Sequence, residues 1–231
     1  MKCLYPIADN DVHVFRMPVI NSNMYVLIKM GAALIIDPCV SSEAEYLLRS
    51  NKVAQCTILL THEHYDHISG INRLRKLFGC KVICSLKCAD LIGDSHKNGA
   101  STFGALFLSH GEGARNMVEK LWEPEYYCEA DEVYKDKKTF LWQKLKVEMK
   151  ETPGHSQGSQ IIKINDKNVF SGDSLIPGQK TITRLPGGSK KLFIEKTLPY
   201  IEKLDIDSVI YPGHYNVVML RNLKITENRN E

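Results

Sequence analysis

Short stretches in which hydrophobic and polar residues alternate predict β-strands in the first part of the chain. The alternation begins around Val12, and two apolar runs follow at residues 24–28 and 32–36, with a short turn between them. Runs of this length, with side chains that repeat every second residue, are typical of strands rather than helices. We therefore expect a strand meander that ends near Asp37, where an Asp-Pro pair favours a turn.

Strands and helices alternate after this meander. A capping serine precedes a predicted helix that runs through Leu48, and residues 57–60 form an apolar run typical of a buried strand. Residues 71–78 place their apolar side chains on one face of a helix, and residues 81–84 return to strand character. The second half repeats the pattern, with predicted strands at residues 145–152, 160–164, 168–171 and 208–211 and a helix at residues 192–204.

Strands in both halves of the chain, each half flanked by helices, indicate an α/β protein. Two such sheets bury their apolar faces best in an αββα sandwich of four layers, with the sheets in the middle. The chain shows no internal repeat and no linker rich in proline or serine, so residues 1–231 are expected to form a single domain. Its length and its hydrophobic content of 43% are ample for a buried core.

A segment of about residues 93–130 does not fit this pattern and is expected to form an inserted cap. The segment contains five glycines and a predicted helix at residues 114–122. Its aromatic side chains either line a substrate pocket or bury the insertion against the sandwich or against the second subunit of a homodimer. These aromatic residues are Phe103, Phe107, Trp122, Tyr126 and Tyr127.

Charge and cysteine content narrow the function classes. A net charge of +3 is too weak to predict a nucleic-acid partner. No apolar run approaches the roughly 20 residues that a membrane-spanning helix needs, and Asp9 and Asp11 interrupt the place where a signal peptide needs an apolar stretch. The odd set of seven cysteines is typical of reduced thiols rather than of a disulfide framework. We expect a cytoplasmic protein that acts on a small molecule.

The strongest chemical signal follows the predicted strand at residues 57–60. Residues 61–67 read Thr-His-Glu-His-Tyr-Asp-His, so three imidazoles and one aspartate carboxylate fall within six positions. A loop at the end of a strand can turn several such side chains inward. Histidine nitrogen and aspartate oxygen both bind Zn²⁺, at about 2.0 to 2.2 Å. The spacing therefore predicts a metal site.

Three more candidate ligands each follow an apolar, strand-like run. His155, Asp173 and His214 all stand directly after a glycine, which allows the backbone to approach a metal ion closely. Five of the eight histidines then belong to one pattern. The remaining histidines are expected at the surface or hydrogen-bonded within the fold, and they are His13, His96 and His110.

These motifs resemble those of the metallo-β-lactamase superfamily. The resemblance is carried by His-x-His-x-Asp-His at residues 62–67 and by the later His155, Asp173 and His214, and it spans nearly the whole chain. It implies the αββα fold and a metal-dependent hydrolase. Within the superfamily, the hydrolases of the glyoxalase II type are most similar, on the strength of Gly172-Asp173-Ser174-Leu175 and Arg184-Leu185-Pro186-Gly187-Gly188.

Carried over position by position, the resemblance implies two divalent metal ions, Zn²⁺ or alternatively Fe or Mn. A hydroxide that bridges the two ions would attack the substrate, without a serine or cysteine nucleophile. Asp66 is the implied catalytic residue, because it can orient this hydroxide as well as bind metal. The implied ligands are His62, His64 and His155 for one ion, Asp66, His67 and His214 for the other, and Asp173 as the bridge between them.

The expected reaction is hydrolysis of a small ester, thioester or lactone. A persulfide dioxygenase with a single iron, held by His62, His155 and Asp173, is the first alternative, and a phosphodiesterase is the second. Zinc β-lactamases of the best-known subclass have cysteine at the position of Asp173, so β-lactam hydrolysis is not expected. The 17 residues after His214 are too few for the helical C-terminal domain of glyoxalase II, so a substrate other than hydroxyacylglutathione is expected.

A few other residues have predicted roles beside the ligands. Asp37 is a candidate hydrogen-bond partner for one of the ligand histidines. Tyr215 follows the last histidine, where relatives commonly have glycine, and its ring either packs on substrate or lies in the core. The thiols of Cys80, Cys84 and Cys88 are spaced by four residues but are expected to be buried rather than to form a second metal site.

Overall fold

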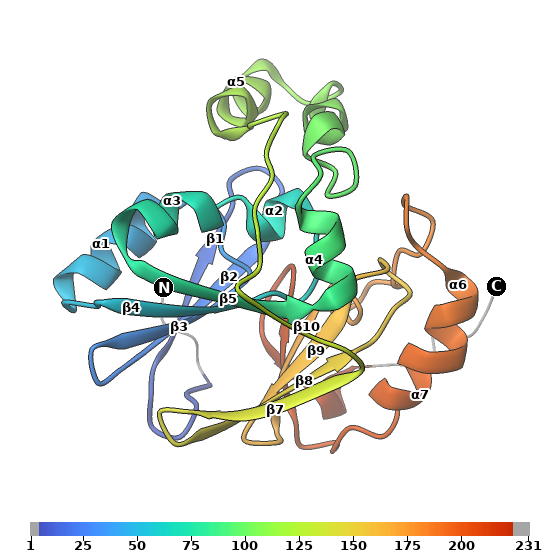
Figure 1. The fold of residues 1–231 in the computed structure, drawn as a ribbon. Helices are drawn as coiled ribbons and strands as arrows, with labels where there is room; N and C mark the ends of the chain where they lie inside the picture. The colour runs from blue at the N-terminus through green and yellow to red at the C-terminus, as the bar shows by residue number, and fades with distance from the viewer. Residues whose placement is uncertain (1–4, 224–231) are drawn as a thin grey trace.

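Two β-sheets lie at the centre of the computed structural model, which describes residues 5–223 (Figure 1). In this part of the chain each sheet has six strands. The first sheet consists, in spatial order, of β1 (Val12–Arg16), β2 (Asn23–Lys29), β3 (Ala32–Ile36), β4 (Gln55–Leu59), β5 (Gly79–Ser85) and β6 (Glu132–Tyr134). The second consists of β12 (Val218–Met219), β11 (Val209–Pro212), β10 (Asn168–Gly172), β9 (Gln160–Ile164), β8 (Leu145–Glu151) and β7 (Lys137–Trp142).

Helices cover the outer faces of both sheets, so the predicted αββα sandwich of the α/β class is confirmed (Figure 1). The first sheet is covered by α1 (Ser42–Ser50), α2 (Tyr65–Ile68), α3 (Ile71–Leu77) and α4 (Leu86–Ile92). The second is covered by α6 (Lys190–Leu192), the π-helical segment η2 (Phe193–Thr197) and α7 (Leu198–Ile201), and the 3-10 turn η3 (Leu220–Asn222) follows β12. Within residues 5–223, no helix has the length and apolar character to cross a membrane.

The central strands are covered on both faces, which is why their sequences are apolar at consecutive positions. In β2, Met24 and Val26 pack into the core beneath the helices, whereas Tyr25 and Leu27 pack into the core between the two sheets. Successive side chains of a strand point to opposite faces, so a strand with two covered faces needs apolar residues at both. The consecutive apolar residues in the sequence therefore indicate that these strands lie in the inner layers of the sandwich.

Strand directions bring three strand ends of the second sheet to one edge of the sandwich. In the first sheet, β3, β4 and β5 run parallel. In the second, β10 runs parallel to β11, and β8 has the same direction because both β8 and β10 pair antiparallel with β9. The carboxyl ends of β8, β10 and β11 therefore meet, which is the place where ligands bind in many α/β folds.

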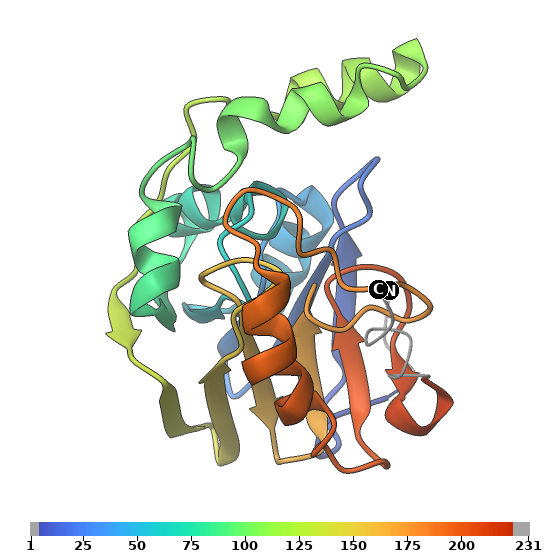
Figure 2. The same ribbon diagram turned by 90° about the vertical axis from the view of Figure 1, so that its right-hand side faces the viewer.

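The expected insertion forms an arm of residues 99–122 that projects from the sandwich. The arm contains the 3-10 helix η1 (Ala100–Phe107) and α5 (Glu112–Leu121), and Figure 2 shows both running across the end of the molecule above α2. Phe103 and Phe107 are only 4% exposed and Tyr126 is 3% exposed. These three rings therefore help to bury the insertion, which is one of its two expected roles, whereas Tyr127 is 61% exposed.

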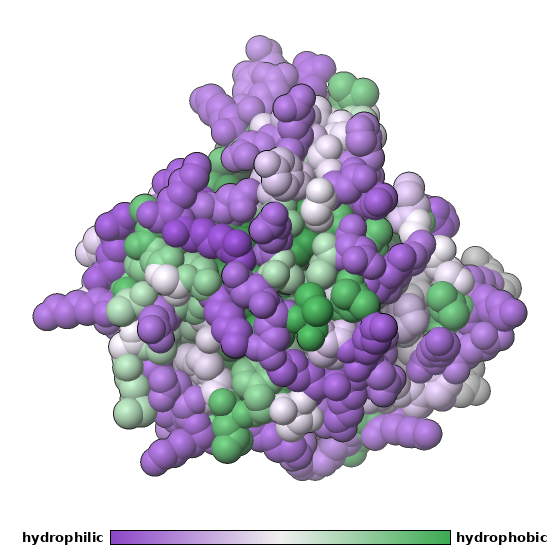
Figure 3. Space-filling view, viewed as in Figure 1, coloured by the Kyte–Doolittle hydropathy of each residue, from purple (hydrophilic) through white to green (hydrophobic). Residues whose placement is uncertain are grey.

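The apolar surface of the arm comes from aliphatic side chains. Leu106, Leu108 and Met117 are all exposed. Elsewhere, hydrophilic side chains cover most of the face drawn in Figure 3, with apolar ones scattered among them, as is normal for a folded protein. The body also exposes some apolar side chains, among them Ile182 and Leu185.

Several parts of the second half differ from the sequence prediction, among them the short strands β6 and β12, which were not predicted. The helix expected at residues 192–204 ends at Ile201 and contains η2, which ends two residues before Pro199. Proline has no N–H and its ring clashes with the carbonyl of the preceding helical turn, which a wider π turn relieves. The edge strand β7 was not predicted, because its side chains are mostly exposed or half-buried and give no hydrophobic signal.

The cysteines behave as the sequence predicted. Within residues 5–223 all six cysteines are free, and Cys84 and Cys88 are buried while Cys80 is half-buried. Among the described residues, no group of side chains that could hold a metal ion includes a cysteine. Burial raises the pKa of the Cys88 thiol well above its ordinary value, so this group stays protonated and inert.

We predict that truncation of Phe170 strongly destabilises the sandwich. Its ring is fully buried between the sheets and stacks on Tyr211 with ring centroids 4.4 Å apart. Phe170→Ala should lower the free energy of unfolding by about 3 to 5 kcal/mol, measured by urea denaturation. The control Leu141→Ala removes a side chain that is 73% exposed and should change it by less than about 0.5 kcal/mol. Equal effects of the two substitutions would contradict the assignment of the core.

Candidate metal centre

Four chain segments, each following a strand, supply all the predicted ligands. The segment after β4 turns directly into α2, whose first residues are Tyr65, Asp66 and His67. Asp173 comes directly after β10, and the other two segments follow β8 and β11. The structure brings all seven predicted residues together at this edge: His62, His64, Asp66, His67, His155, Asp173 and His214.

Six of these residues form two triads of possible metal ligands. The first triad is His62, His64 and His155, and the second is Asp66, His67 and His214; within each triad the ligand atoms lie within 4.8 Å of one another. In the first triad, His155 Nε2 is 3.1 Å from His64 Nδ1. In the second, Asp66 Oδ2 is 3.3 Å from His67 Nε2 and 3.7 Å from His214 Nε2.

The carboxylate of Asp173 lies between the two triads. Its Oδ2 is 3.7 Å from His155 Nε2 in the first triad and 3.4 Å from His214 Nε2 in the second. Its Oδ1 is 3.7 Å from His67 Nε2. A carboxylate in this position can offer one oxygen to each of two cations, which is the geometry expected of the bridging residue.

Asp37 fixes the orientation of two of the imidazoles, which confirms its expected contact with a ligand histidine. Its carboxylate accepts hydrogen bonds from Thr61 N at 2.7 Å, Thr61 Oγ1 at 2.5 Å and His67 Nδ1 at 3.2 Å. Because the Thr61 hydroxyl donates to Asp37, it accepts from His62 Nδ1 at 3.0 Å. Both rings are therefore held through Nδ1, and their Nε2 atoms are left to face the other ligands, where a cation would bind.

Backbone carbonyls orient two further imidazoles in the same way. His155 Nδ1 donates to Ile182 O at 2.8 Å, and His214 Nδ1 donates to Ile20 O at 3.2 Å. Both rings then present Nε2 to the cluster. His64 is the exception, since its Nδ1 is the atom that faces His155.

Several buried polar atoms at the centre of the cluster lack a hydrogen-bond partner in the described part of the chain. They are His62 Nε2, His67 Nε2 and Asp173 Oδ1. Buried polar atoms are nearly always paired, so unpaired atoms that face one another need another partner. Imidazole nitrogens and carboxylate oxygens are ligands that divalent cations accept, and the residues present therefore fit metal ions.

Burial and neighbouring charge place these groups in forms that bind metal. Burial lowers the pKa of His62 well below its ordinary value and that of His64 to about 4, so both rings are neutral at neutral pH. Burial alone would raise the pKa of Asp66, but His67 and His214 lower it to about 2. Asp173 likewise stays ionised, because His214 and His67 outweigh its burial and hold its pKa well below the ordinary value.

The second triad also holds imidazoles with raised basicity. Burial would lower the pKa of His67, but Asp66 and Asp37 raise it well above its usual range. Burial would likewise lower the pKa of His214, and Asp173 raises it. The carboxylates thus favour positive charge at this position, and binding of a cation would displace protons from these rings.

Two glycines allow the ligand segments to come this close. A side chain at Gly213 would collide with Asp173 Oδ1, and one at Gly172 would collide with the Thr61 side chain. Gly172 also has a φ of +49°, a region that favours glycine. Gly213 N donates to Gly172 O at 2.8 Å, which joins the Asp173 and His214 segments.

Glu63 has a structural role that the sequence analysis missed. This carboxylate is buried between the ligands His62 and His64, and it accepts from Ser156 Oγ at 2.8 Å and from Gly158 N at 3.5 Å. It therefore ties the segment after β4 to the segment that carries His155. Burial raises its pKa, which the bond from Ser156 partly offsets. No local pattern signals this contact, because its partners lie more than 90 positions away.

Tyr215 is not part of the core, which rules out one of its two predicted roles. Its side chain is 57% exposed directly after His214. Its φ is +67°, in the region that non-glycine residues adopt with strain. Asn23 Nδ2 donates to its carbonyl at 2.8 Å and so stabilises this backbone conformation.

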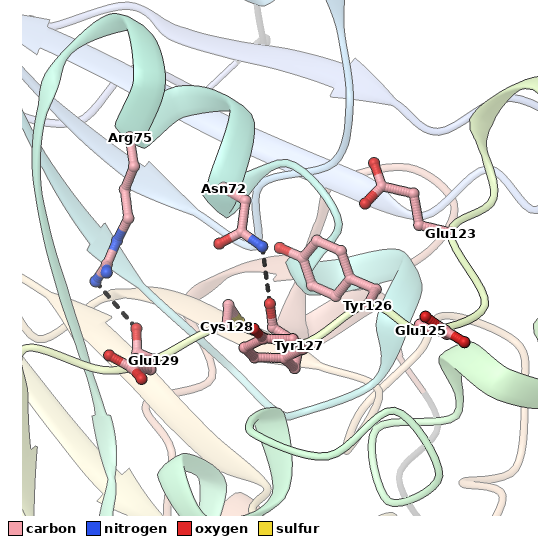
Figure 4. A pocket seen from close by; sticks show the side chains of 8 residues that line it. All are labelled: Asn72, Arg75, Glu123, Glu125, Tyr126, Tyr127, Cys128 and Glu129. Carbon is pink, nitrogen blue, oxygen red and sulfur yellow. Dashed lines mark hydrogen bonds between the residues drawn. The ribbon is translucent and has the colours of Figure 1, made fainter.

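A pocket at the base of the arm is separate from this centre. Figure 4 shows its lining, which includes Asn72, Arg75 and Tyr127 but none of the seven predicted ligands. The centre itself reaches the surface where His64, Asp173 and His214 are half-buried, whereas His62 and His67 are almost fully buried. A substrate would therefore approach from the side of the half-buried ligands.

We predict that Glu63 sets the metal affinity of the first triad. Glu63→Leu removes the acceptor for Ser156 Oγ and should weaken metal binding there about tenfold, whereas Glu63→Gln keeps an acceptor and should change it less than about threefold. Titration against a metal-binding dye measures both. Glu43→Leu, on the exposed face of α1, serves as the control. Unchanged affinity in Glu63→Leu would contradict the role of this contact.

Comparisons with known proteins agree with the fold and the centre. A family model described as the metallo-beta-lactamase superfamily matches residues 17–214. The chain is 27% identical to "Probable metallo-hydrolase YqgX" of Bacillus subtilis (strain 168) over 203 residues, covering 86% of this chain and 88% of that protein. It is 25% identical to "Hydroxyacylglutathione hydrolase" of Prochlorococcus marinus (strain MIT 9211) over 213 residues, covering 88% of this chain and 69% of that one.

A solved structure is similar to this chain in both fold and sequence. The BLEG-1 B3 metallo-beta-lactamase superposes with a TM-score of 0.73 at 26% sequence identity, over 91% of this chain and 95% of that one. The family model covers most of the chain, and the strand order, the clustered histidines and aspartates and the relatives all agree with it. The chain therefore belongs to the metallo-beta-lactamase superfamily, whose members are metal-dependent hydrolases.

Proposed function

We propose that this protein is a dinuclear metal-dependent hydrolase that acts on the carbonyl group of a small ester, thioester or lactone. The observation that carries the proposal is the Asp173 carboxylate, which lies between two separate triads with an oxygen within 3.7 Å of each. Each triad with one oxygen of Asp173 offers four donor atoms. Such a set holds one divalent cation and leaves coordination positions for water and substrate.

Divalent cations at the two triads would supply a hydroxide at neutral pH and polarise the substrate carbonyl. The imidazole and carboxylate donors suit Zn²⁺, and Fe or Mn are alternatives with the same donor preference. No serine or cysteine nucleophile is then needed.

The roles of the protein groups follow from their charge and position. The low pKa of Asp66, about 2, keeps its carboxylate ionised at neutral pH, so it can accept a hydrogen bond from the attacking water and orient it. Asp37 and the carbonyl of Ile182 hold the ligand rings in place before substrate arrives. Asp66 is therefore the proposed catalytic residue, and Asp37 is a positioning residue.

The substrate class rests on the comparisons as well as on the chemistry. A relative named hydroxyacylglutathione hydrolase supports a thioester or ester, whose carbonyl carbon accepts a hydroxide readily. The similarity to a B3 metallo-beta-lactamase adds the cyclic amide of a β-lactam to the substrates that need testing.

Purified protein with its metals should hydrolyse a glutathione thioester or a p-nitrophenyl ester, lose the activity in a chelator and regain it when metal is restored. The panel includes a lactone, a β-lactam, a phosphodiester and glutathione persulfide with oxygen uptake. Oxygen uptake with one iron per chain would replace the proposal by a persulfide dioxygenase. Preference for the phosphodiester or the β-lactam would contradict the proposed substrate class.

We predict about two metal ions per chain, with Asp173 required for both. Asp173→Ala should lose both ions and the activity while the fold survives, whereas His214→Ala should chiefly empty the second triad. Elemental analysis and circular dichroism measure these outcomes. The control Asp166→Ala changes an exposed aspartate that pairs with Lys146 and should retain both ions. Two ions and full turnover in Asp173→Ala would show that the bridging role is wrong.

A further inference from the structure

Tyr65 lies within the ligand motif but has no place in the metal chemistry. It stands between His64 and Asp66 at the start of α2, and its side chain is 1% exposed. Its ring makes edge contacts with Phe103 and Tyr126, with ring centroids 5.0 and 5.4 Å away. The side chain of this residue therefore packs into the base of the arm rather than among the candidate ligands.

The Tyr65 hydroxyl makes hydrogen bonds to the backbone at the C-terminal end of the arm. It donates to Leu121 O at 2.9 Å and accepts from Glu123 N at 2.9 Å. Leu121 is the last residue of α5, where helix carbonyls lack partners within the helix, and Glu123 is the first residue after the arm. One side chain of the ligand motif thus satisfies two backbone groups at the end of the arm and directly after it.

The residues directly before the arm are also hydrogen-bonded to α2, the short helix that begins at Tyr65. Tyr65 N donates to Asn98 O at 2.9 Å, and Asn98 Nδ2 donates to Tyr126 O at 3.0 Å. Tyr126 in turn donates its hydroxyl to Ile68 O at 2.6 Å. Both ends of the arm are therefore bonded to α2, the helix that also carries Asp66 and His67.

The residues that follow the arm are hydrogen-bonded to α3 of the body. The two helices of the arm also pack against each other. Figure 4 shows Asn72 and Arg75 of α3, which donate to Tyr127 O at 2.8 Å and to Glu129 O at 3.0 Å. Inside the arm, Trp122 donates to Ala100 O, and its ring lies where a side chain on Gly104 would collide with it. The arm is thus a small packed unit, joined to the metal centre through Tyr65.

We propose that Tyr65 is a positioning residue that holds the arm in a fixed orientation relative to the metal centre. Figure 2 shows the arm across the end of the sandwich above α2, and the arm carries the exposed aliphatic side chains of Leu106, Leu108 and Met117. We also assign a role in substrate recognition to the arm, which rests on the proposed hydrolase function. The arm recognises a bulky apolar acyl group of the substrate. The arm is then the substrate cap, with aliphatic rather than aromatic contacts.

The first test measures the orientation of the arm without any substrate. The chain has two tryptophans, so the background Trp142→Phe leaves Trp122 of the arm as the only reporter. In this background Tyr65→Phe removes the hydroxyl but keeps the ring. It should add a nanosecond component to the anisotropy decay of Trp122 and raise acrylamide quenching about twofold, with metal content and circular dichroism unchanged.

The control makes the same change from tyrosine to phenylalanine at a buried position outside the arm. Tyr134→Phe removes another buried hydroxyl, which donates to Gln160 in the body of the sandwich, and should leave the Trp122 decay as in the parent. An unchanged decay in Tyr65→Phe, or an equal change in both variants, would overturn the positioning role of Tyr65.

The second test measures substrate choice. The ratio of kcat/KM for benzoyl or butyryl thioesters to that for acetyl thioester should fall about tenfold in Tyr65→Phe, the size of effect expected from one or two buried hydrogen bonds. The ratio should be unchanged in Tyr134→Phe. A mobile arm with an unchanged ratio would overturn the role in acyl recognition. If the parent hydrolyses no thioester or ester, the proposed function fails, while the Trp122 measurement still decides the role of Tyr65.

Discussion

The structure depends on the concentration of ionisable groups around Asp173 in a place with little access to water. Five imidazoles and the carboxylate of Asp66 surround it, and His62, His67 and His155 are at most 2% exposed. Without cations such an arrangement is unfavourable, because buried polar atoms remain unpaired and charged groups lose their hydration. Divalent cations at the two proposed sites would compensate the carboxylate charge and pair with the buried ligand atoms.

The surrounding residues hold this unfavourable cluster in one geometry. Asp37 reaches two ligand rings, directly to His67 and through Thr61 to His62, and the carbonyls of Ile182 and Ile20 orient two more. These partners come from both sheets and from the loop before β2, so the ligand geometry depends on the whole sandwich. Tyr65 extends the same connection outward, from the ligand helix to the arm.

Sequence alone predicted the parts of the structure that rest on local pattern. Apolar strands with two covered faces indicated the layers, and the dense motif at residues 62–67 with three later ligands indicated the complete cluster. The contacts of Glu63 and Tyr65 could not be predicted, because their partners are brought close only by the fold. Whether Phe103 and Phe107 line a pocket or pack inward was left open for the same reason, since an aromatic residue gives no local sign of the direction in which it packs.

The central claim is that two cations share the Asp173 carboxylate, and anomalous X-ray diffraction from crystals of the protein grown with its metals tests it most directly. The account predicts two anomalous peaks in each chain, one beside His62, His64 and His155 and the other beside Asp66, His67 and His214, with Asp173 in contact with both. A single peak beside the first triad, with the second triad empty at full metal loading, would contradict it.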